Sequence, residues 1–305
     1  MMQTEVKDVL RLADMTGEDL GRLRRFTIDF GADPEGRGGA LRDGTVLCWL
    51  TVPSRGVSYI VSVATRQLGG AAVALDPDEL RARRVGSLEN AARVLSSLGR
   101  LLVVGGLEDH DVNRLAAAAS VPVVNAFSDR HNPCEALAEL ATLEQRIGSL
   151  QGVRLAYLGQ SCNVTHDLMA GAALAGATLW VATPEACQPS PSITAHASVL
   201  AARHGGHLQL TRRPAQAVER ADGIVLGPLP RSWRNMDPGL VASANRDVAL
   251  LSCSPDGDCE DWPIDTRRLL RDEHQESRLS AYKAVLYALS ERVFKRPAGE
   301  PSGEV

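Results

Sequence analysis

Residues 153–182, VRLAYLGQSCNVTHDLMAGAALAGATLWVA, contain the pattern that decides the fold. The apolar run at 153–158 predicts a buried strand, residues 164–175 predict a helix, and residues 178–182 predict a second strand. Strands that alternate with helices in this way lie parallel in one sheet, with helices covering its faces.

The same alternation extends in both directions from this unit. Further strands are predicted at 45–50, 71–75, 100–104, 121–125, 207–211, 223–226 and 248–252. Helices are predicted at 58–68, 87–98, 111–119, 133–150, 192–204, 214–220 and 276–294, with two short helices between residues 6 and 30. This pattern predicts an α/β protein with two doubly wound parallel sheets, one in each of two domains.

The long helix at 133–150 is expected to join the two domains. We expect the first domain to cover residues 1–145 and the second to cover residues 146–275, with the last helix, 276–294, packing back on the first domain. Residues 295–305 are rich in Pro, Gly, Ser and Glu, so we expect a disordered tail there.

The composition fits a globular enzyme with small-molecule substrates. The 305 residues carry a formal net charge of -4, which argues against nucleic-acid binding because that requires a basic surface. The six cysteines lack the paired Cys-x-x-Cys spacing of a zinc site, so we expect no metal, and reduced thiols in the cytoplasm. The N-terminus has no signal-peptide core, and no apolar run approaches the roughly 20 residues that span a membrane.

Several short motifs follow the predicted strands, at the edge where open parallel sheets bind their ligands. They are Val57-Ser-Tyr59 with Gln67-Leu-Gly-Gly70, Val121-Pro-Val-Val-Asn125, Asn132-Pro-Cys-Glu-Ala-Leu-Ala-Glu-Leu140, Leu158-Gly159 with Asn163-Val164, Ser252-Cys-Ser-Pro255 and Glu276-Ser-Arg278. In kind and order they resemble the motifs of the aspartate/ornithine carbamoyltransferase family, and the ornithine branch in particular. The resemblance runs from about residue 8 to about residue 288, nearly the whole chain.

The resemblance implies a first domain that binds carbamoyl phosphate and a second domain that binds an amine acceptor. The site would lie between the domains, at a subunit border of a homotrimer. In this family an unprotonated amine attacks the carbamoyl carbon, an oxyanion develops and phosphate leaves, without a metal or an organic cofactor. The protein must therefore supply cations for the phosphate, hydrogen-bond donors for the oxyanion, and positioning.

On the donor side, Ser54-Arg55-Gly56 stands where the family has its phosphate loop, Ser-x-Arg-Thr-Arg. These residues precede a predicted helix, whose free N–H groups can bind phosphate. One arginine and one threonine of the family's loop are missing. The alternative interpretation is a short loop with a surface arginine.

Other donor-side positions also depart from the family. Gly105-Gly106 replaces an arginine, and Asn132 aligns with the histidine on the oxyanion side, although a small loop change would let His131 take that role. Glu135 stands where a glutamine accepts from the carbamoyl NH2 group; the alternative is a solvated glutamate. Arg278 is the best-retained cation of the site, with a surface residue as its alternative.

On the acceptor side, Asn163 matches the residue that holds the amino-acid backbone, with a turn-forming asparagine as the alternative. Gly227 replaces the aspartate that pairs with the side-chain amine of ornithine. Ser252-Cys253-Ser254 stands where the family has His-Cys-Leu, so Cys253 is retained, either as a site thiol or as an inert buried one. These changes predict an acceptor other than ornithine or aspartate.

Three functions are compatible with these departures. The first is transfer of a carbamoyl or related acyl group from its phosphate to the amine of a non-standard amino acid, as in secondary metabolism. The second is a reaction of the same cleft on an amidino, ureido or carbamoylated compound without carbamoyl phosphate. The third is an inactive paralogue that assembles with an active one. A dinucleotide-dependent dehydrogenase is set aside, because residues 159–163, GQSCN, lack the Gly-x-Gly-x-x-Gly turn.

Overall fold

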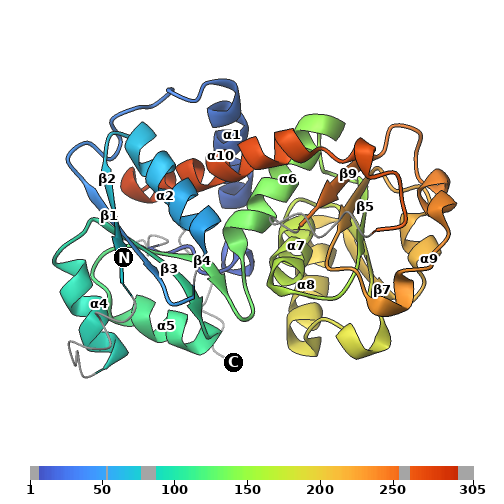
Figure 1. Cartoon of the computed structure of the whole chain (residues 1–305), viewed down its shortest axis with the longest axis horizontal. Helices are drawn as coiled ribbons and strands as arrows, with labels where there is room; N and C mark the ends of the chain where they lie inside the picture. Colours follow the sequence, from blue (N-terminus) through green and yellow to red (C-terminus); the bar gives the residue numbers. More distant parts are fainter. Residues whose placement is uncertain (1–6, 53, 77–86, 254–261, 295–305) are drawn as a thin grey trace.

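The computed structural model describes residues 7–52, 54–76, 87–253 and 262–294. Two parallel sheets form two α/β halves that lie side by side, and helices α6 (Pro133–Ile147) and α10 (Arg271–Ser290) run between and across them (Figure 1). The predicted fold class, two parallel-sheet domains with helices on both faces, is confirmed.

The first sheet has the strand order β2-β1-β3-β4, and every pair is parallel. Its strands are β1 (Thr45–Leu50), β2 (Ala71–Leu75), β3 (Leu101–Leu107) and β4 (Val123–Ser128). The order reverses between β1 and β3, so the loops after these strands diverge to opposite faces. A ligand is expected at the carboxyl ends of the strands around this reversal.

The second sheet has the order β7-β6-β5-β8-β9, again with parallel pairs only. Its strands are β5 (Arg154–Leu158), β6 (Thr178–Ala182), β7 (His207–Thr211), β8 (Gly223–Leu226) and β9 (Ala249–Ser252). Here the order reverses between β5 and β8. The loops after β5, β8 and β9 therefore meet at one edge of the sheet.

Helices cover both faces of each sheet. The remaining α-helices are α1 (Gly17–Ala32), α2 (Arg55–Gln67), α4 (Leu88–Ser96), α5 (Asp109–Ala118), α7 (Asn163–Leu174), α8 (Pro191–His204) and α9 (Pro214–Val218). Short 3-10 turns are η1 (Leu12–Asp14), η2 (Glu185–Cys187), η3 (Arg231–Trp233), η4 (Pro238–Ser243) and η6 (Thr266–Arg268). None of the helices in the described part of the chain is long and apolar enough to cross a membrane.

Alternate residues along a strand point to opposite faces, and this divides the core. In β1, Val46 faces the central core, whereas Leu47 faces a smaller core under α4 and α5. In β5, Leu155 faces the same central core, whereas Ala156 faces a third core beside α9. One continuous apolar core thus runs from the inner face of the first sheet to the inner face of the second.

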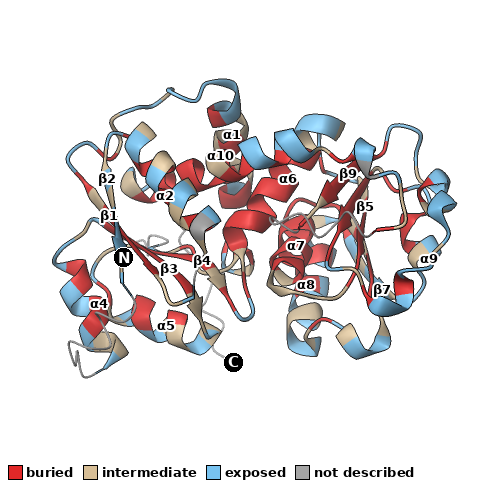
Figure 2. Ribbon diagram, in the orientation of Figure 1, coloured by how far each residue is buried: buried red, intermediate tan, exposed pale blue. Residues whose placement is uncertain are grey.

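Helix α6 occupies the middle of this central core. Every residue from Pro133 to Leu143 is buried (Figure 2). Asn132 caps the helix and Pro133 occupies its first turn, where a missing N–H costs nothing. A helix that is buried on all sides fixes the first turn relative to everything around it, and that first turn carries Asn132 and Glu135.

The structure corrects several predicted boundaries. The two short helices expected before residue 30 are one 3-10 turn, η1, and one long helix, α1. The helix expected at 133–150 ends at Ile147, because Gly148 adopts a positive φ of 101°. The helix expected at 276–294 begins earlier, at Arg271, and ends at Ser290; Asp272 and Glu273 form its acidic first turn.

The third strand also runs further than predicted. β3 continues to Leu107 instead of stopping at Val104, because irregularities in its pairing with β4 let the ladder resume after Gly105. Helix α10 packs against α1, α2 and α6, which brings the end of the chain back to the first sheet. The exact limits of the two domains remain a prediction, as does the expected disorder of residues 295–305, which lie outside the described residues.

Candidate active site

The phosphate-loop candidates lie at the start of α2. Ser54 is the N-cap residue, and its hydroxyl makes no capping hydrogen bond. Gly56 follows in the first turn, is exposed and has open space where a side chain would be. Arg55 begins the helix, but its side chain lies outside the described part of the structure. The free N–H groups of this turn can therefore face an anion.

No arginine could stand at the end of β3 without rearrangement. A Cβ atom on Gly105 would lie 2.7 Å from a ring carbon of Phe127, and one on Gly106 would lie 2.7 Å from Val52. Gly106 also has a positive φ of 79°, which favours glycine. The local backbone and packing of β3 therefore favour glycine at positions 105 and 106, where the family has an arginine.

Asn132 caps α6 with its side-chain oxygen. Oδ1 accepts a hydrogen bond from the backbone N–H of Glu135 at 3.2 Å. The amide Nδ2 makes no hydrogen bond to any residue that the structure describes, so it remains a donor. The side chain is only partly buried. Asn132 is thus held in place by one end while the other end is available to a ligand.

Glu135 and Arg278 form a buried ion pair. Arg278 Nε donates to Glu135 Oε2 at 2.8 Å, and the two side chains are 7% and 6% exposed. Arg278 Nη1 donates to Gln275 Oε1 at 3.1 Å. Neither residue is a solvated surface group. Their roles in a substrate site stay predictions. The guanidinium charge is largely balanced by the carboxylate.

His274 lies on the other side of Glu135. Its Nε2 is 3.4 Å from Glu135 Oε1, but the angle is not that of a hydrogen bond, so Oε1 retains accepting capacity. Burial lowers the pKa of His274, the charge of Glu135 opposes this and the charge of Arg278 adds to it. Burial is the largest of these influences, so the neutral form of the His274 ring is favoured.

Asp167, on α7, ties the two halves of the molecule together. Its Oδ1 accepts from the backbone N–H of Leu12 at 2.7 Å, and its Oδ2 accepts from the backbone N–H of Asn132 at 2.7 Å. Oδ2 also lies 3.2 Å from His131 Nδ1. His131 is buried against this carboxylate. Of the pair His131 and Asn132, His131 is buried, whereas Asn132 is only partly buried.

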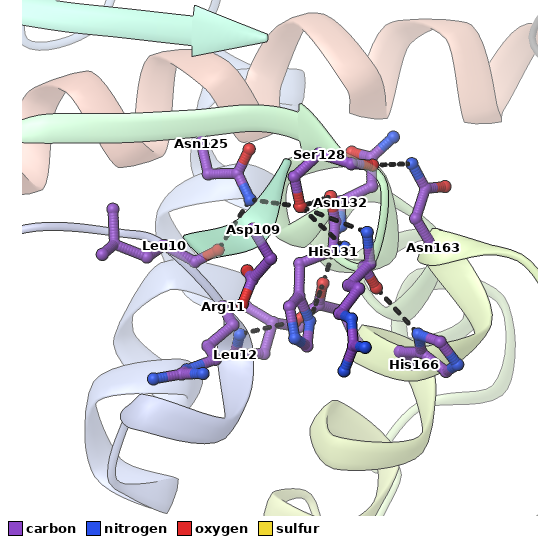
Figure 3. A network of polar contacts seen from close by, with 12 residues as sticks. Leu10, Arg11, Leu12, Asp109, Asn125, Ser128, His131, Asn132, Asn163 and His166 are labelled. Atoms are coloured by element: carbon purple, nitrogen blue, oxygen red, sulfur yellow. Dashed lines mark hydrogen bonds and ion pairs between the residues drawn. The ribbon is translucent and has the colours of Figure 1, made fainter. Parts of the chain in front are cut away.

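Two further side chains of α7 reach the loop after β4. Asn163 Nδ2 donates to the backbone oxygen of Ser128 at 2.8 Å, and His166 Nδ1 donates to the backbone oxygen of Arg130 at 2.8 Å (Figure 3). The other ring nitrogen of His166 accepts from the N–H of Ser190 at 3.3 Å. Asn163 is thus part of the junction between the halves, and its carbonyl oxygen is the group left for a ligand.

Cys253 lies at the carboxyl end of β9 and is 4% exposed. Its backbone N–H donates to the oxygen of Leu226 at 2.9 Å, which places it beside the end of β8. Ser252 ends the strand, and Ser254 lies outside the described residues. The cysteine therefore sits at the carboxyl edge of the second sheet, one strand away from the reversal between β5 and β8 near which an acceptor is expected.

Gly227 follows β8 and has no room for a side chain. A Cβ atom there would lie 1.9 Å from the hydroxyl oxygen of Tyr157. That hydroxyl donates to the backbone oxygen of Gln160 at 2.6 Å, so it is held in place. An aspartate at position 227 is excluded by this arrangement as it stands, as well as by the sequence.

The two best-formed surface cavities lie away from these residues. The larger, about 590 Å³, is lined by residues that precede β1 and β3, including Gly44 and Arg100, at the amino edge of the first sheet. The smaller, about 300 Å³, lies between α1, α6 and the start of α10, beside Gly31, Gln145 and Glu273.

Sequence reasoning missed three residues of this region. Asp167 and His274 lie on helix faces that look like ordinary helix surface in the sequence, and nothing in their spacing signals their partners. Cys162 was seen only as one of six scattered cysteines, although it occupies the N-cap of α7, a position where side chains commonly bond the helix.

Comparison with known proteins identifies the family of the chain. Residues 7–145 match the family model "Aspartate/ornithine carbamoyltransferase, carbamoyl-P binding domain", and residues 151–289 match "Aspartate/ornithine carbamoyltransferase, Asp/Orn binding domain". The chain belongs to the aspartate/ornithine carbamoyltransferase family. The family expected from the sequence motifs is thus confirmed, with an affinity to the ornithine branch.

Individual carbamoyltransferases resemble the chain over most of its length. The ornithine carbamoyltransferase of Thermococcus kodakarensis is 31% identical over 303 residues, which are 92% of this chain and 95% of that protein. That of Rhodococcus jostii is 33% identical over 76% of this chain and 79% of that protein. The solved ornithine carbamoyltransferase of Pyrococcus furiosus has a TM-score of 0.84 at 29% identity, covering 95% of this chain and 98% of that chain.

Proposed function

We propose that this carbamoyltransferase-family protein transfers a carbamoyl or related acyl group from its phosphate to an amine that is neither ornithine nor aspartate. The observation that carries the proposal is the contact between Gly227 and Tyr157, because it excludes a carboxylate where the ornithine branch pairs with its acceptor. The acceptor would be the amine of a non-standard amino acid, and the protein a cytoplasmic homotrimer serving secondary metabolism.

The donor side supports a carbamoyl phosphate site with fewer charges. The phosphate would lie at the N-terminus of α2, near Ser54 and Gly56, where helix N–H groups stabilise an anion. Asn132 Nδ2 would donate to the developing oxyanion. Glu135 Oε1 would accept from the carbamoyl NH2 group, while Arg278, held by Glu135, orients the carbamoyl plane.

A turnover assay with a panel of amines tests this proposal. The purified protein is given carbamoyl phosphate and either ornithine, aspartate or non-standard diamino and guanidino acids, and phosphate release and carbamoylated product are both measured. We expect product with an amine outside the two standard acceptors and much slower product with ornithine. Citrulline formation at a rate typical of metabolic enzymes, about 10 per second, would contradict the proposal.

A second candidate is favoured by the buried ion pair of Glu135 and Arg278. The N–H groups of a planar amidino or ureido compound can donate to a carboxylate in the donor pocket. A donor that carries a negative phosphate is repelled by the same carboxylate. The two candidates predict opposite effects of Glu135→Gln. If carbamoyl phosphate is the donor, removal of the negative charge should tighten its binding; if an amidino compound is the substrate, the same change should weaken substrate binding.

A further inference from the structure

Two thiols from different elements meet at the carboxyl edge of the second sheet. Cys162 caps the N-terminus of α7, four residues after β5, and Cys253 is the first residue after β9. Both lie at the end of β8: the sulfur of Cys162 is 3.7 Å from the Tyr157 hydroxyl, which abuts Gly227, and the backbone N–H of Cys253 donates to the oxygen of Leu226 at 2.9 Å. Both are free thiols. Such a pair has the components of a disulfide without the bond.

The surroundings make the two thiols unequal. Cys253 is buried, whereas Cys162 is only partly buried. The sulfur of Cys162 lies 3.4 Å from Thr165 Oγ1, a hydroxyl that can donate to a thiolate. It also lies at a helix N-terminus, where the helix dipole favours negative charge.

The pKa values of the two thiols are shifted in opposite directions. The hydrogen bond from Cys253, with those from Thr165, outweighs burial and lowers the pKa of Cys162 below that of an ordinary thiol. The hydrogen bond with Cys162, together with burial, raises the pKa of Cys253. The thiol that solvent can reach is thus the one that ionises first, which is the arrangement of an attacking and a resolving cysteine.

We propose that Cys162 and Cys253 form a redox-sensitive dithiol that small disulfides, such as oxidised glutathione, convert into an intramolecular disulfide. In the first step the Cys162 thiolate attacks one sulfur of the small disulfide, its S–S bond breaks, and one thiolate leaves and takes up a proton. In the second step Cys253 loses its proton and attacks the Cys162 sulfur, and the second small thiol leaves. One small disulfide is reduced to two thiols as the protein pair is oxidised.

The new bond would tie the start of α7 to the segment after β9. Asn163, the next residue after Cys162, also carries the hydrogen bond to Ser128 in the first half. Oxidation would therefore constrain the acceptor edge and the junction together. This inference concerns the thiols alone and does not depend on the proposed function, so it can fail or hold independently of the acceptor assay.

Thiol trapping after glutathione oxidation tests the proposal. The reduced full-length protein is incubated with mixtures of reduced and oxidised glutathione, quenched with N-ethylmaleimide, digested without reductant and analysed by mass spectrometry. We expect a peptide pair linked through Cys162 and Cys253. In Cys253→Ser, glutathione should remain trapped on Cys162; in Cys162→Ser, Cys253 should carry no glutathione.

Cys187 provides the matched control, because it is partly buried like Cys162 and its sulfur contacts only Gln160 Oε1, at 3.6 Å, among the residues described. Cys187→Ser should form the same linked peptide pair as the unsubstituted protein. The proposal is overturned if the oxidised protein keeps both thiols alkylatable, or if glutathione stays on Cys162 while Cys253 remains reduced.

Discussion

The amide side chain of Asn132 can cap a helix and donate a hydrogen bond to a ligand at the same time. Its oxygen caps α6, and its amide nitrogen is a donor without a partner in the described structure. A charged histidine at this position could not accept the capping hydrogen bond. The substitution that separates the tasks is aspartate, because Asp caps a helix as well as Asn but donates nothing.

Asn132→Asp should leave stability nearly unchanged and lower turnover by about 100–1000-fold, the usual effect of losing an oxyanion donor. Thermal unfolding checks the first part and initial rates with the best acceptor check the second. Asn132→Ala, which loses both groups, should lower the free energy of unfolding by about 1 kcal/mol as well. Equal rates for Asn132→Asp and the unsubstituted protein would show that the amide does not assist the reaction.

The contact of Gly227 with Tyr157 also belongs to the scale of residues. Gly227→Ala should reduce the free energy of unfolding by about 1–3 kcal/mol, because the new methyl group overlaps the Tyr157 hydroxyl. Adding Tyr157→Phe should restore part of the loss. Gly56→Ala, where a Cβ atom meets nothing within 4 Å, is the control. Urea unfolding of the single and double variants measures the coupling, and strictly additive losses would argue against the overlap.

At the scale of elements, strands were predicted better than helix ends. The strands at 45–50, 71–75, 178–182 and 207–211 coincide with those of the structure, because short apolar runs between turn residues have few alternatives. Helix ends depend on local capping and tertiary contacts. Helix α10 starts at Arg271, directly after Leu270, whose backbone N–H donates to the oxygen of Leu250. No sequence pattern predicts this contact.

Helix α6 contains a buried acid, Glu139, that the family motifs do not distinguish from its neighbours. Glu139 is fully buried, and neither carboxylate oxygen has a hydrogen-bond partner in the described structure. Burial first, and then the charge of Glu135, raises the pKa of Glu139 well above its usual value. The protein therefore holds this side chain as a neutral acid.

Replacement of Glu139 by methionine should stabilise the protein increasingly as pH rises. Because the folded pKa is raised, the stability of the unsubstituted protein is fully present below the unfolded pKa and is lost as pH rises from there toward the folded value. At about pH 8 we expect Glu139→Met to gain about 1–3 kcal/mol in free energy of unfolding, and less at about pH 5. Urea unfolding at both pH values tests this; a gain that does not grow with pH would contradict it.

At the scale of the whole molecule, the junction between the halves explains why the site was only partly predictable. The motifs indicated which residues face the carboxyl edges, but Asp167 contacts Leu12, His131 and Asn132 from the other half of the chain. Those contacts depend on how two sheets are placed relative to each other. The pairing of Glu135 with Arg278 is equally non-local, since 143 positions separate them.

The junction also predicts a pH dependence centred on His131. Burial lowers the pKa of His131, but the hydrogen bond and charge of Asp167, helped by Asp109 and opposed by Arg11, raise it overall. The resulting stabilisation is fully present below the unfolded pKa, about 6.5, and is lost as pH rises through the folded value. Burial lowers the pKa of His166, so its effect on stability changes with pH in the opposite direction. The titration of each histidine must therefore be measured separately.

NMR titration of the histidine ring signals checks this prediction. In the unsubstituted protein, His131 should titrate above about 6.5. In Asp167→Asn its pKa should fall, and the protein should lose about 1–3 kcal/mol because one of the three groups that bond Asp167 is left without an acceptor. An unchanged His131 pKa in Asp167→Asn would show that the ion pair does not form in solution.

We propose that this fold still uses carbamoyl phosphate although its donor pocket has lost cationic groups. The decisive experiment is calorimetric titration with carbamoyl phosphate, with Asn132→Asp as the matched variant. We predict saturable binding that inorganic phosphate competes for and that Asn132→Asp weakens. Absence of binding to the unsubstituted, folded protein at millimolar concentration would contradict the account and leave the amidino or ureido reaction, or a role as an assembly partner of an active enzyme.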